Sequence, residues 1–315
     1  MGKISRAQRR KGYFKIYEQI YESPIQSITD ISQNTGISRN TVAKYLQEMY
    51  AQGILFGPYI KMKPAKNYRE YVYLLNFSNP FSVLQGLKGF PHVLHCAVTF
   101  GGWNIIVTTD KNLDFSRLVG FKSMVARGVK GFTSTPKVEH TSWSECFQRV
   151  CEKIKEFTPF QRGTREHTLT FLDWGKDEWK LYHAFKSNAR EKVTPLLRKI
   201  KVQYEIYTKW GKNLENHCTV HTEFYPEGFQ TYLRHCFLFS SDYRPVVRSL
   251  FSLFPTSSVI TEVGDQLLGY THVPSPDIIR RLFCTIYDMQ TVKMIKRFSQ
   301  AVVLSCYNAT NRMER

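Results

Sequence analysis

The chain has 315 residues, 42% hydrophobic and 14% aromatic, which is enough to close the cores of two to four modest domains. Its 44 Lys and Arg outnumber 26 Asp and Glu, and the formal charge of +18 points to a polyanionic partner, nucleic acid first. No apolar run reaches the roughly 18 residues of a membrane span, and no secretory signal opens the chain, so we expect a cytoplasmic protein.

The positive charge is concentrated in the first half. Residues 1–70 hold 12 basic and 5 acidic residues, and residues 71–165 hold 12 and 6. Residues 166–230 are nearly balanced, with 10 and 9. The seven cysteines are scattered and form no CxxC pair, so we interpret them as reduced core residues rather than a disulfide framework or zinc ribbon.

The stretch TGISRNTVAKYLQEM, residues 35–49, is typical of the second half of a helix-turn-helix. Ser27 and Ser38 are expected to cap two helices, with Gly36 in the turn between them. Apolar side chains then recur at positions i, i+3, i+4 and i+7 and predict one buried stripe. That stripe consists of Val42, Tyr45, Leu46 and Met49.

The opposite face of this helix carries groups that can bond phosphates and base edges in a major groove. Its candidate DNA-binding residues are Ser38, Arg39, Asn40, Thr41, Lys44 and Gln47. The run ILFGPYIKMKP predicts two short strands around Gly57-Pro58, a wing whose Lys61 and Lys63 would hold phosphates. Further phosphate contacts are expected from Arg9, Arg10 and Lys11. The alternative is a structural helix-turn-helix with a solvated outer face, which the basic surroundings disfavour.

Two segments about 162 residues apart share one pattern of strand, helix, two strands, helix and strand. In the first, the expected elements are strands 71–77, 93–100 and 103–109, helices 80–89 and 115–126, and a strand from Val129. In the second, they are strands 235–239, 258–263 and 266–272, helices 243–254 and 278–289, and a strand in the 290s. This order predicts two ferredoxin-like βαββαβ sandwiches.

A second helical block precedes the second segment. It begins at LDWGKDEWKLY, where Asp177 is a plausible helix cap, but its turn lacks glycine. Glu205 takes the place of Asn40, and a carboxylate there would repel phosphates. We interpret this block as a degenerate winged helix that packs or binds a partner.

The fold class is therefore α+β, an internal duplication of a winged helix-turn-helix followed by a sandwich. Five segments are predicted: a winged helix at 1–67, a sandwich at 68–143, a helix and linker at 144–165, a degenerate winged helix at 166–230, and a second sandwich at 231–315. The boundary between the two copies is placed at 159–164.

The run ITDISQNTGISRNTVAKYLQEMYAQGIL, followed by the sandwich pattern, resembles the leucine-responsive regulator/asparagine regulator (Lrp/AsnC) family of bacterial and archaeal transcription factors. The resemblance implies sandwiches that dimerise, between chains or as a pseudo-dimer within one chain, and a small effector such as an amino acid. It also places effector binding at the turn between the middle strands. Here those turns hold Gly101, Gly102, Gly264 and Asp265.

The predicted function is a sequence-specific DNA-binding transcriptional regulator that binds double-stranded DNA, with no catalytic residue, metal or cofactor expected. Two alternatives stay open. A tetrapyrrole-decarboxylase-like enzyme would need His and Arg residues converging in a cleft between the sandwiches, and the sequence alone does not assemble such a set. A protein-binding adaptor would use the second helical block. A metal site at His217, Cys218 and His221 is disfavoured, because on a strand Cys218 points away from the histidines.

Overall fold

The computed structural model describes residues 5–159 and 169–308, so the predicted boundary at 159–164 lies almost wholly outside the described residues. The chain opens with a three-helix unit of α1 (Arg6–Glu22), α2 (Ile28–Thr35) and α3 (Arg39–Ala51). The predicted caps are confirmed: Ser27 accepts from the Asp30 amide and Ser38 from the Thr41 amide. Gly36 ends α2 at φ 69°, a conformation that favours glycine. The apolar stripe of α3 is buried against α1 and α2.

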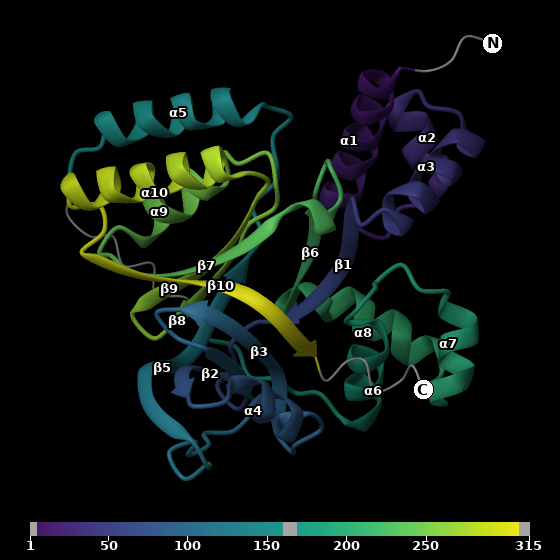
Figure 1. The fold of residues 1–315 in the computed structure, drawn as a ribbon. Coiled ribbons are helices and arrows are strands. Elements are labelled where there is room, and N and C mark those ends of the chain that lie inside the picture. Colours follow the sequence, from purple (N-terminus) through teal and green to yellow (C-terminus); the bar gives the residue numbers. More distant parts are fainter. Residues whose placement is uncertain (1–4, 160–168, 309–315) are drawn as a thin grey trace.

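The predicted two-stranded wing is wrong. Residues Leu55–Met62 form a single strand, β1, which pairs antiparallel with β6 (Cys218–Phe224) from the other half of the chain. Because a distant strand takes up the backbone bonds of β1, the run does not fold back on itself at Gly57-Pro58. β1 and β6 make a two-stranded ribbon, which lies between the two helical units in Figure 1.

A second three-helix unit precedes β6, built from α6 (Lys176–Phe185), α7 (Val193–Ile200) and α8 (Tyr204–His217). Gly175 is the N-cap of α6, so the prediction of Asp177 as the cap is wrong by two residues. The two strands of the ribbon contribute side chains to the cores of both helical units. Ile60 and Met62 of β1 enter the core of this second unit, whereas Phe224 of β6 enters the core of the first.

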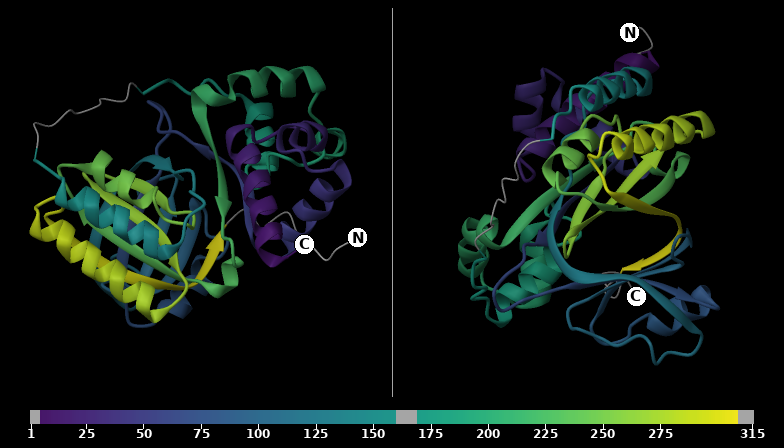
Figure 2. Two further views of the ribbon diagram at one scale, coloured as in Figure 1. Left: turned by 90° about the horizontal axis from the view of Figure 1, so that it is seen from above. Right: turned by 90° about the vertical axis from the view of Figure 1, so that its left-hand side faces the viewer.

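The remaining strands form a closed barrel in the order β10-β3-β4-β2-β5-β8-β9-β7. In chain order they are β2 (Tyr71–Phe77), β3 (Val93–Gly101), β4 (Ile105–Thr109), β5 (Phe121–Ser134), β7 (Leu233–Ser240), β8 (Val259–Val263), β9 (Gln266–Val273) and β10 (Arg297–Asn308). The expected pair of separate ferredoxin-like sandwiches is corrected to this one barrel. The reason is that β5 pairs with both β2 and β8, and β10 with both β7 and β3, so the two sheets merge at their edges. Figure 2 shows these two long strands curving around the barrel.

The helices outside the barrel are unevenly distributed. α5 (Trp143–Lys155), α9 (Arg244–Phe251) and α10 (Pro276–Thr291) pack together on the second half of the barrel, and α4 (Pro80–Leu87) lies on the first half. The predicted helix at 115–126 is wrong. Its later residues belong to β5, because pairing with β2 overrides the local helical pattern. In the described residues of the first half, α4 is therefore the one helix against the sheet.

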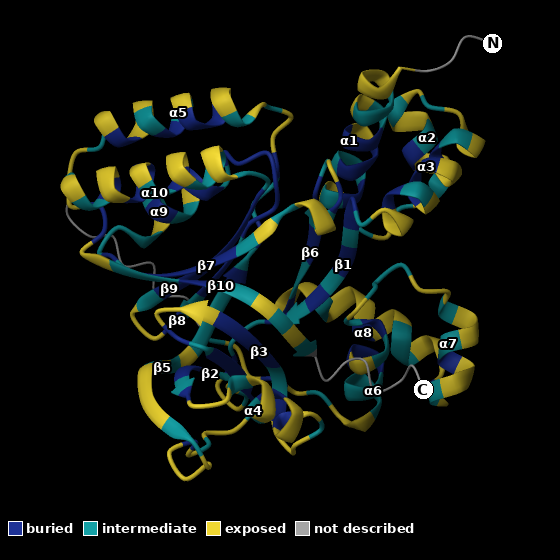
Figure 3. Ribbon diagram, viewed as in Figure 1, coloured by how far each residue is buried: buried dark blue, intermediate teal, exposed yellow. Residues whose placement is uncertain are grey.

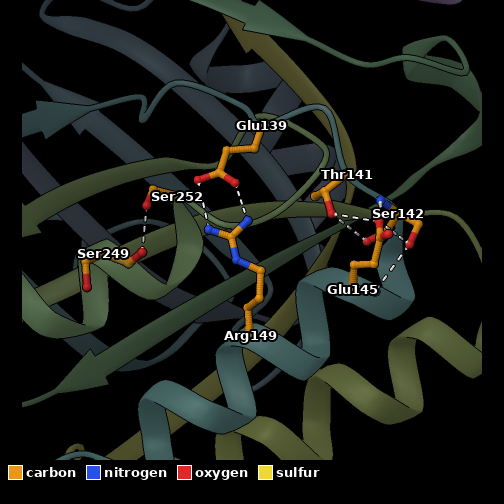
Figure 4. Close-up of polar contacts among 7 residues, drawn as sticks. All are labelled: Glu139, Thr141, Ser142, Glu145, Arg149, Ser249 and Ser252. Atoms are coloured by element: carbon orange, nitrogen blue, oxygen red, sulfur yellow. Dashed lines mark hydrogen bonds and ion pairs between the residues drawn. The ribbon is translucent and has the colours of Figure 1, made fainter.

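The start of α5 is locked by polar side chains (Figure 4). Ser142 accepts from the Glu145 amide at 3.2 Å, and the Glu145 carboxylate accepts in return from the Ser142 amide at 2.9 Å. Arg149 forms an ion pair with Glu139 in the segment that leads from β5. These contacts direct α5 across to the second half, where its buried face meets α10 and its outer face stays in solvent (Figure 3).

The glycines of the predicted effector turns lie where the two halves of the barrel meet. Gly101 has φ 142°, and a Cβ there would stand 2.5 Å from the Gln300 carbonyl oxygen of β10. Gly264 has φ 59° and donates its amide to the Val129 carbonyl of β5 at 2.9 Å. Gly101 is therefore required for close backbone approach, whereas at Gly264 glycine is favoured by the positive φ alone.

Replacing Gly101 by alanine should lower the free energy of unfolding by about 2–4 kcal/mol, because the methyl group both strains φ and collides with β10. Urea unfolding measures the change. Gly86→Ala is the matched control, since Gly86 lies in exposed α4 with nothing within 4 Å of its would-be Cβ. That control should be neutral or slightly stabilising. Equal stabilities for the two variants would show that the barrel tolerates a side chain at this position.

Among the described residues, no helix is long and apolar enough to cross a membrane.

Candidate nucleic-acid interface and ligand pocket

The polar face of α3 is free in the structure. Arg39, Asn40, Lys44 and Gln47 are exposed, and neither Arg39 nor Lys44 forms an ion pair among the described residues. Thr41 is half-buried, with its hydroxyl 2.8 Å from that of Ser38 at the N-terminus of the helix. Asn40, Lys44 and Gln47 thus lie opposite the buried stripe of α3, as a helix that enters a groove requires, and the other three predicted residues lie at or next to its N-terminus.

The predicted basic residues of α1 are partly engaged. Arg9 lies 3.8 Å from Glu48 of α3, and Arg10 lies 3.8 Å from Glu227, while Lys11 is exposed. Both ion pairs leave the arginine side chains about two-fifths exposed, so each pair contributes little to stability and the guanidinium groups can still approach an anion.

The two wing lysines are not on a wing. Lys63 donates from its Nζ to the Glu215 carbonyl oxygen at 2.5 Å, which ties β1 to α8. Lys61 is largely buried and its Nζ lies 4.0 Å from the Glu223 carboxylate. The structure therefore takes both lysines away from the surface that α3 presents, and it places Lys61 in the wall of a cavity.

That cavity has a volume of about 470 Å³ and lies between the barrel and the β1–β6 ribbon. Its size is within the range of roughly 300–1,000 Å³ found for small-molecule pockets. Each of the eight barrel strands contributes at least one residue to the wall, and the ribbon and the end of α6 close the other side. Its aromatic wall consists of Phe56, Tyr59, Tyr68, Tyr182, Tyr225, Phe229 and Tyr270.

The pocket carries more positive than negative charge. Its four cationic side chains are Lys61, Lys130, Lys186 and Arg234, and its two carboxylates are Glu70 and Glu223, so the formal charge is 4 − 2 = +2. Lys130 is paired with Glu70. Lys186 and Arg234 have no carboxylate partner among the described residues. Burial lowers the pKa of both Lys61 and Lys186, which shows how poorly this site solvates a positive charge.

Arg234 is the most distinctive of these cations. It starts from β7, and its guanidinium carbon lies 4.6 Å from the centre of the Tyr270 ring. Its Nε is buried and has no hydrogen-bond partner among the described residues. A buried guanidinium that is held by a ring and not neutralised by an acid is suited to a carboxylate or phosphate supplied by a ligand.

Two pocket histidines are neutral near pH 7. Burial, together with the positive charge of Arg234, lowers the pKa of His95 on β3 and of His272 on β9 to about 3. The Nδ1 of His272 lies 3.2 Å from the Ser257 carbonyl oxygen, which can only accept, so Nδ1 carries the proton. Its Nε2 is then an acceptor, and it has no partner among the described residues.

Sequence reasoning missed this set. The His and Arg residues that the enzyme alternative required do converge, but they come from β3, β7 and β9, and no local motif connects them. The predicted effector residues Gly101, Gly102, Gly264 and Asp265 do not line this cavity. They close the barrel instead.

The histidine and cysteine cluster considered for a metal is engaged in other contacts. His221 is buried, with Nε2 2.6 Å from the Thr219 hydroxyl and Nδ1 3.0 Å from that of Thr135. His217 faces Asp173 at 3.5 Å, and Cys218 packs against Met62. Within residues 5–159 and 169–308, no group of three or more metal-binding side chains comes together.

The buried histidines predict a loss of stability in acid. The pKa of His221 and of His272 is about 3 in the folded chain, against about 6.5 when unfolded. The unfolded chain therefore binds protons between pH 6.5 and 3 that the folded chain does not, and the free energy of unfolding falls as the pH drops through this window. Between pH 7 and 5 we expect urea unfolding to show a loss of about 2 kcal/mol for each of these two histidines, roughly 4 kcal/mol together. His272→Asn should make the decline shallower; an unchanged slope would contradict the assignment.

Comparison with known proteins bears on both sites. Residues 14–55 match the family model described as winged helix-turn-helix DNA-binding, which covers the second half of α1 and all of α2 and α3. The chain thus contains a winged helix-turn-helix DNA-binding domain. A comparison with curated proteins finds no match.

Two similar solved structures are of the siroheme decarboxylase NirDL, one of them in co-complex with an iron-uroporphyrin III analogue. They are 13% and 12% identical to this chain, each with a TM-score of 0.46, and cover 94% of this chain and 92% of the other. This finding corrects the expectation that the chain is not an enzyme, because both of these similar structures are of an enzyme. The chemistry of the pocket follows from the residues of this chain.

Proposed function

We propose that the chain is a sequence-specific DNA-binding transcriptional regulator that reads a major groove with α3. The observation that carries the proposal is the exposed polar face of α3, which lies within the matched DNA-binding domain. The surrounding segment, residues 1–70, has a formal charge of +7. Arg39 and Asn40 are suited to base edges, and Lys44 to phosphates. Arg9, Arg10 and Lys11 would add phosphate contacts, whereas Lys61 and Lys63 leave the proposed interface. The expected compartment remains the cytoplasm.

We further propose that one chain is an intramolecular pseudo-dimer of the Lrp/AsnC type that arose by duplication. Both halves of the barrel have the same strand order, β5-β2-β4-β3 and β10-β7-β9-β8. In each half, the strand that comes first along the chain, β2 or β7, lies between the fourth and the third strands of that half. Each half also follows a three-helix unit and a ribbon strand. The exposed Glu205 on α8 supports a division of labour in which α3 alone reads bases.

Selection of bound fragments from genomic DNA of the host tests this function. A regulator should enrich a small set of related sequences, with weaker binding to unrelated DNA at the same salt concentration. A flat enrichment profile would contradict sequence-specific reading.

A second candidate function is supported by the cavity: decarboxylation of a polycarboxylate tetrapyrrole. Arg234 and Lys186 supply unpaired cations for carboxylates, and the aromatic wall supplies faces against which a planar ring can stack. When a carboxyl group leaves as carbon dioxide, its bonding electron pair stays on carbon and a proton must be added there. His95 and His272 line the same cavity and could hold that proton, because bound carboxylates would offset the charge of Arg234, which adds to the effect of burial in lowering their pKa.

This candidate is tested by incubating the protein with siroheme without oxygen and following the products by mass spectrometry. Loss of carbon dioxide that depends on Arg234 would establish the enzyme. Tight binding without any loss of carbon dioxide would leave the pocket as an effector site of the regulator and exclude this reaction.

A further inference from the structure

An arginine of the second helical unit (α6 to α8) forms hydrogen bonds to the helix-turn-helix unit (α1 to α3). Arg190, in the segment between α6 and α7, donates from Nη1 to the Pro24 carbonyl at 3.0 Å and to the Gln26 carbonyl at 2.9 Å. Both carbonyls belong to the turn that connects α1 to α2. Arg190 is half-buried, and this burial lowers its pKa. The position of this segment therefore constrains the helix-turn-helix.

The same short segment forms part of the pocket wall. Lys186 and Ser187 line the cavity, and Lys186 accepts at its carbonyl from the Ile60 amide at 2.9 Å. Three residues on, the Ala189 amide donates to the Pro58 carbonyl at 2.8 Å. The segment 186–190 thus runs from the pocket, along β1, to the turn before α2.

A second connection joins the pocket to the end of the reading helix. Just after α3, Gly53 and Ile54 accept at their carbonyls from the amides of Phe229 and Tyr225, at 2.8 and 2.7 Å. The rings of Phe229 and Tyr225 line the cavity and contact His272. One end of the helix-turn-helix is therefore held by Arg190, four residues after the pocket-lining Lys186, and the other end is held by two residues whose side chains face the pocket.

We propose that an anionic ligand in the barrel pocket regulates the reading helix, through the segment 186–190 at one end and residues 225–229 at the other. The proposal rests on the proposed DNA-binding function. Its physical basis is the charge of the pocket. Lys61 is repelled by Lys130 and Arg234 in a site that solvates positive charge poorly, and Lys186 lines the same cavity without an ion-pair partner among the described residues. An anion removes this repulsion and draws Lys186 and the ribbon towards the barrel, which orders the backbone attached to them.

The experiment places an anion in the pocket without needing the natural ligand. Cys306 of β10 is exposed and lines the cavity, whereas four of the other cysteines are buried. In the full chain with Cys151→Ser and Cys284→Ser, Cys306 is converted to its mixed disulfide with 2-sulfonatoethyl methanethiosulfonate, which transfers the anionic thioalkyl group to Cys306 and releases methanesulfinate. The uncharged 2-hydroxyethyl reagent provides the matched control.

Hydrogen–deuterium exchange is the readout, because it does not require DNA. The anionic adduct should slow exchange in residues 23–27 and 52–56 by about fivefold or more relative to the neutral adduct. With Arg190→Ala the effect at 23–27 should disappear, whereas Arg198→Ala, an exposed arginine in the same unit, should retain it. Equal exchange rates in the anionic and neutral adducts of the protein that retains Arg190 would overturn the proposal, whatever the two arginine variants show.

DNA affinity, measured on the same two adducts, separates this proposal from the proposed function. A shift of about fivefold or more between the adducts, lost with Arg190→Ala, is the expected result. If neither adduct binds DNA while exchange still differs, the coupling stands and the regulator function fails. If both bind DNA equally and exchange does not differ, the regulator function stands and the coupling is wrong.

Discussion

Alanine in place of Arg39 should weaken binding to a selected operator by about 1–3 kcal/mol and relax sequence preference at one base pair. Arg39 is exposed on the polar face of α3 and has no ion pair among the described residues, so its loss leaves the fold intact while removing a group that can bond a guanine edge. The measurement is the affinity for the operator and for its single-base variants at fixed salt. Unfolding in urea should be unchanged.

The second helical unit and the pocket provide matched controls for Arg39. Lys209→Ala on α8 removes an exposed cation from the corresponding helix and should not change which base pairs are preferred. Lys61→Ala should leave the slope of affinity against salt unchanged, because Lys61 faces Glu223 in the pocket wall and not a phosphate. A variant of Arg39 with wild-type affinity and specificity would show that α3 is not the reading helix.

Methionine in place of Arg234 should abolish binding of a polycarboxylate probe, uroporphyrin III, with a loss of about 2–3 kcal/mol or more. The same substitution should not lower stability and can raise it, since it removes a buried charge that has no carboxylate partner among the described residues. Fluorescence titration measures the binding, and thermal unfolding measures the stability. If Arg234 lowers the stability of the fold but is needed to bind the probe, its role is in ligand binding.

Arg248→Met is the control for Arg234, because Arg248 has its carboxylate partner: its Nη2 lies 2.8 Å from Glu262. That variant should lose stability and keep probe affinity, the reverse of the Arg234 result. Arg234→Lys should restore part of the affinity, since the charge returns without the planar group over Tyr270. Unchanged binding by the Arg234 variant would remove the pocket as a polycarboxylate site.

Local patterns predicted the elements that depend on near neighbours. The serine caps of α2 and α3, the glycine between them and the buried stripe from Val42 to Met49 were all visible, because helix ends and helix faces are set by residues three or four apart. Most strands of the barrel were also predicted, to within a few residues at each end. The exposed face of α3 followed directly from the position of its buried face.

The predictions that were wrong concern segments whose strand partners lie outside the local stretch of sequence. Residues 121–126 have a helical pattern but pair with β2, and β1 has a hairpin-like Gly-Pro but pairs with β6. Lys61 illustrates the consequence for function. Its alternation with Ile60 and Met62 predicts a strand, which the structure confirms, but the partner of that strand places Lys61 in the pocket. Register with a distant strand decides which face a side chain takes.

The sequence by itself determined the basic charge, the helix-turn-helix domain and the side chains that α3 exposes, because each depends on composition or on spacing within one helix. Tertiary structure alone decided that two sheets close into one barrel, that β1 and β6 join the two helical units, and that Arg234, His95 and His272 meet in one pocket. The physical reason is that strand pairing brings together residues more than a hundred positions apart. Backbone hydrogen bonds across such distances follow from how all the apolar faces are buried together, and no short stretch of sequence encodes them.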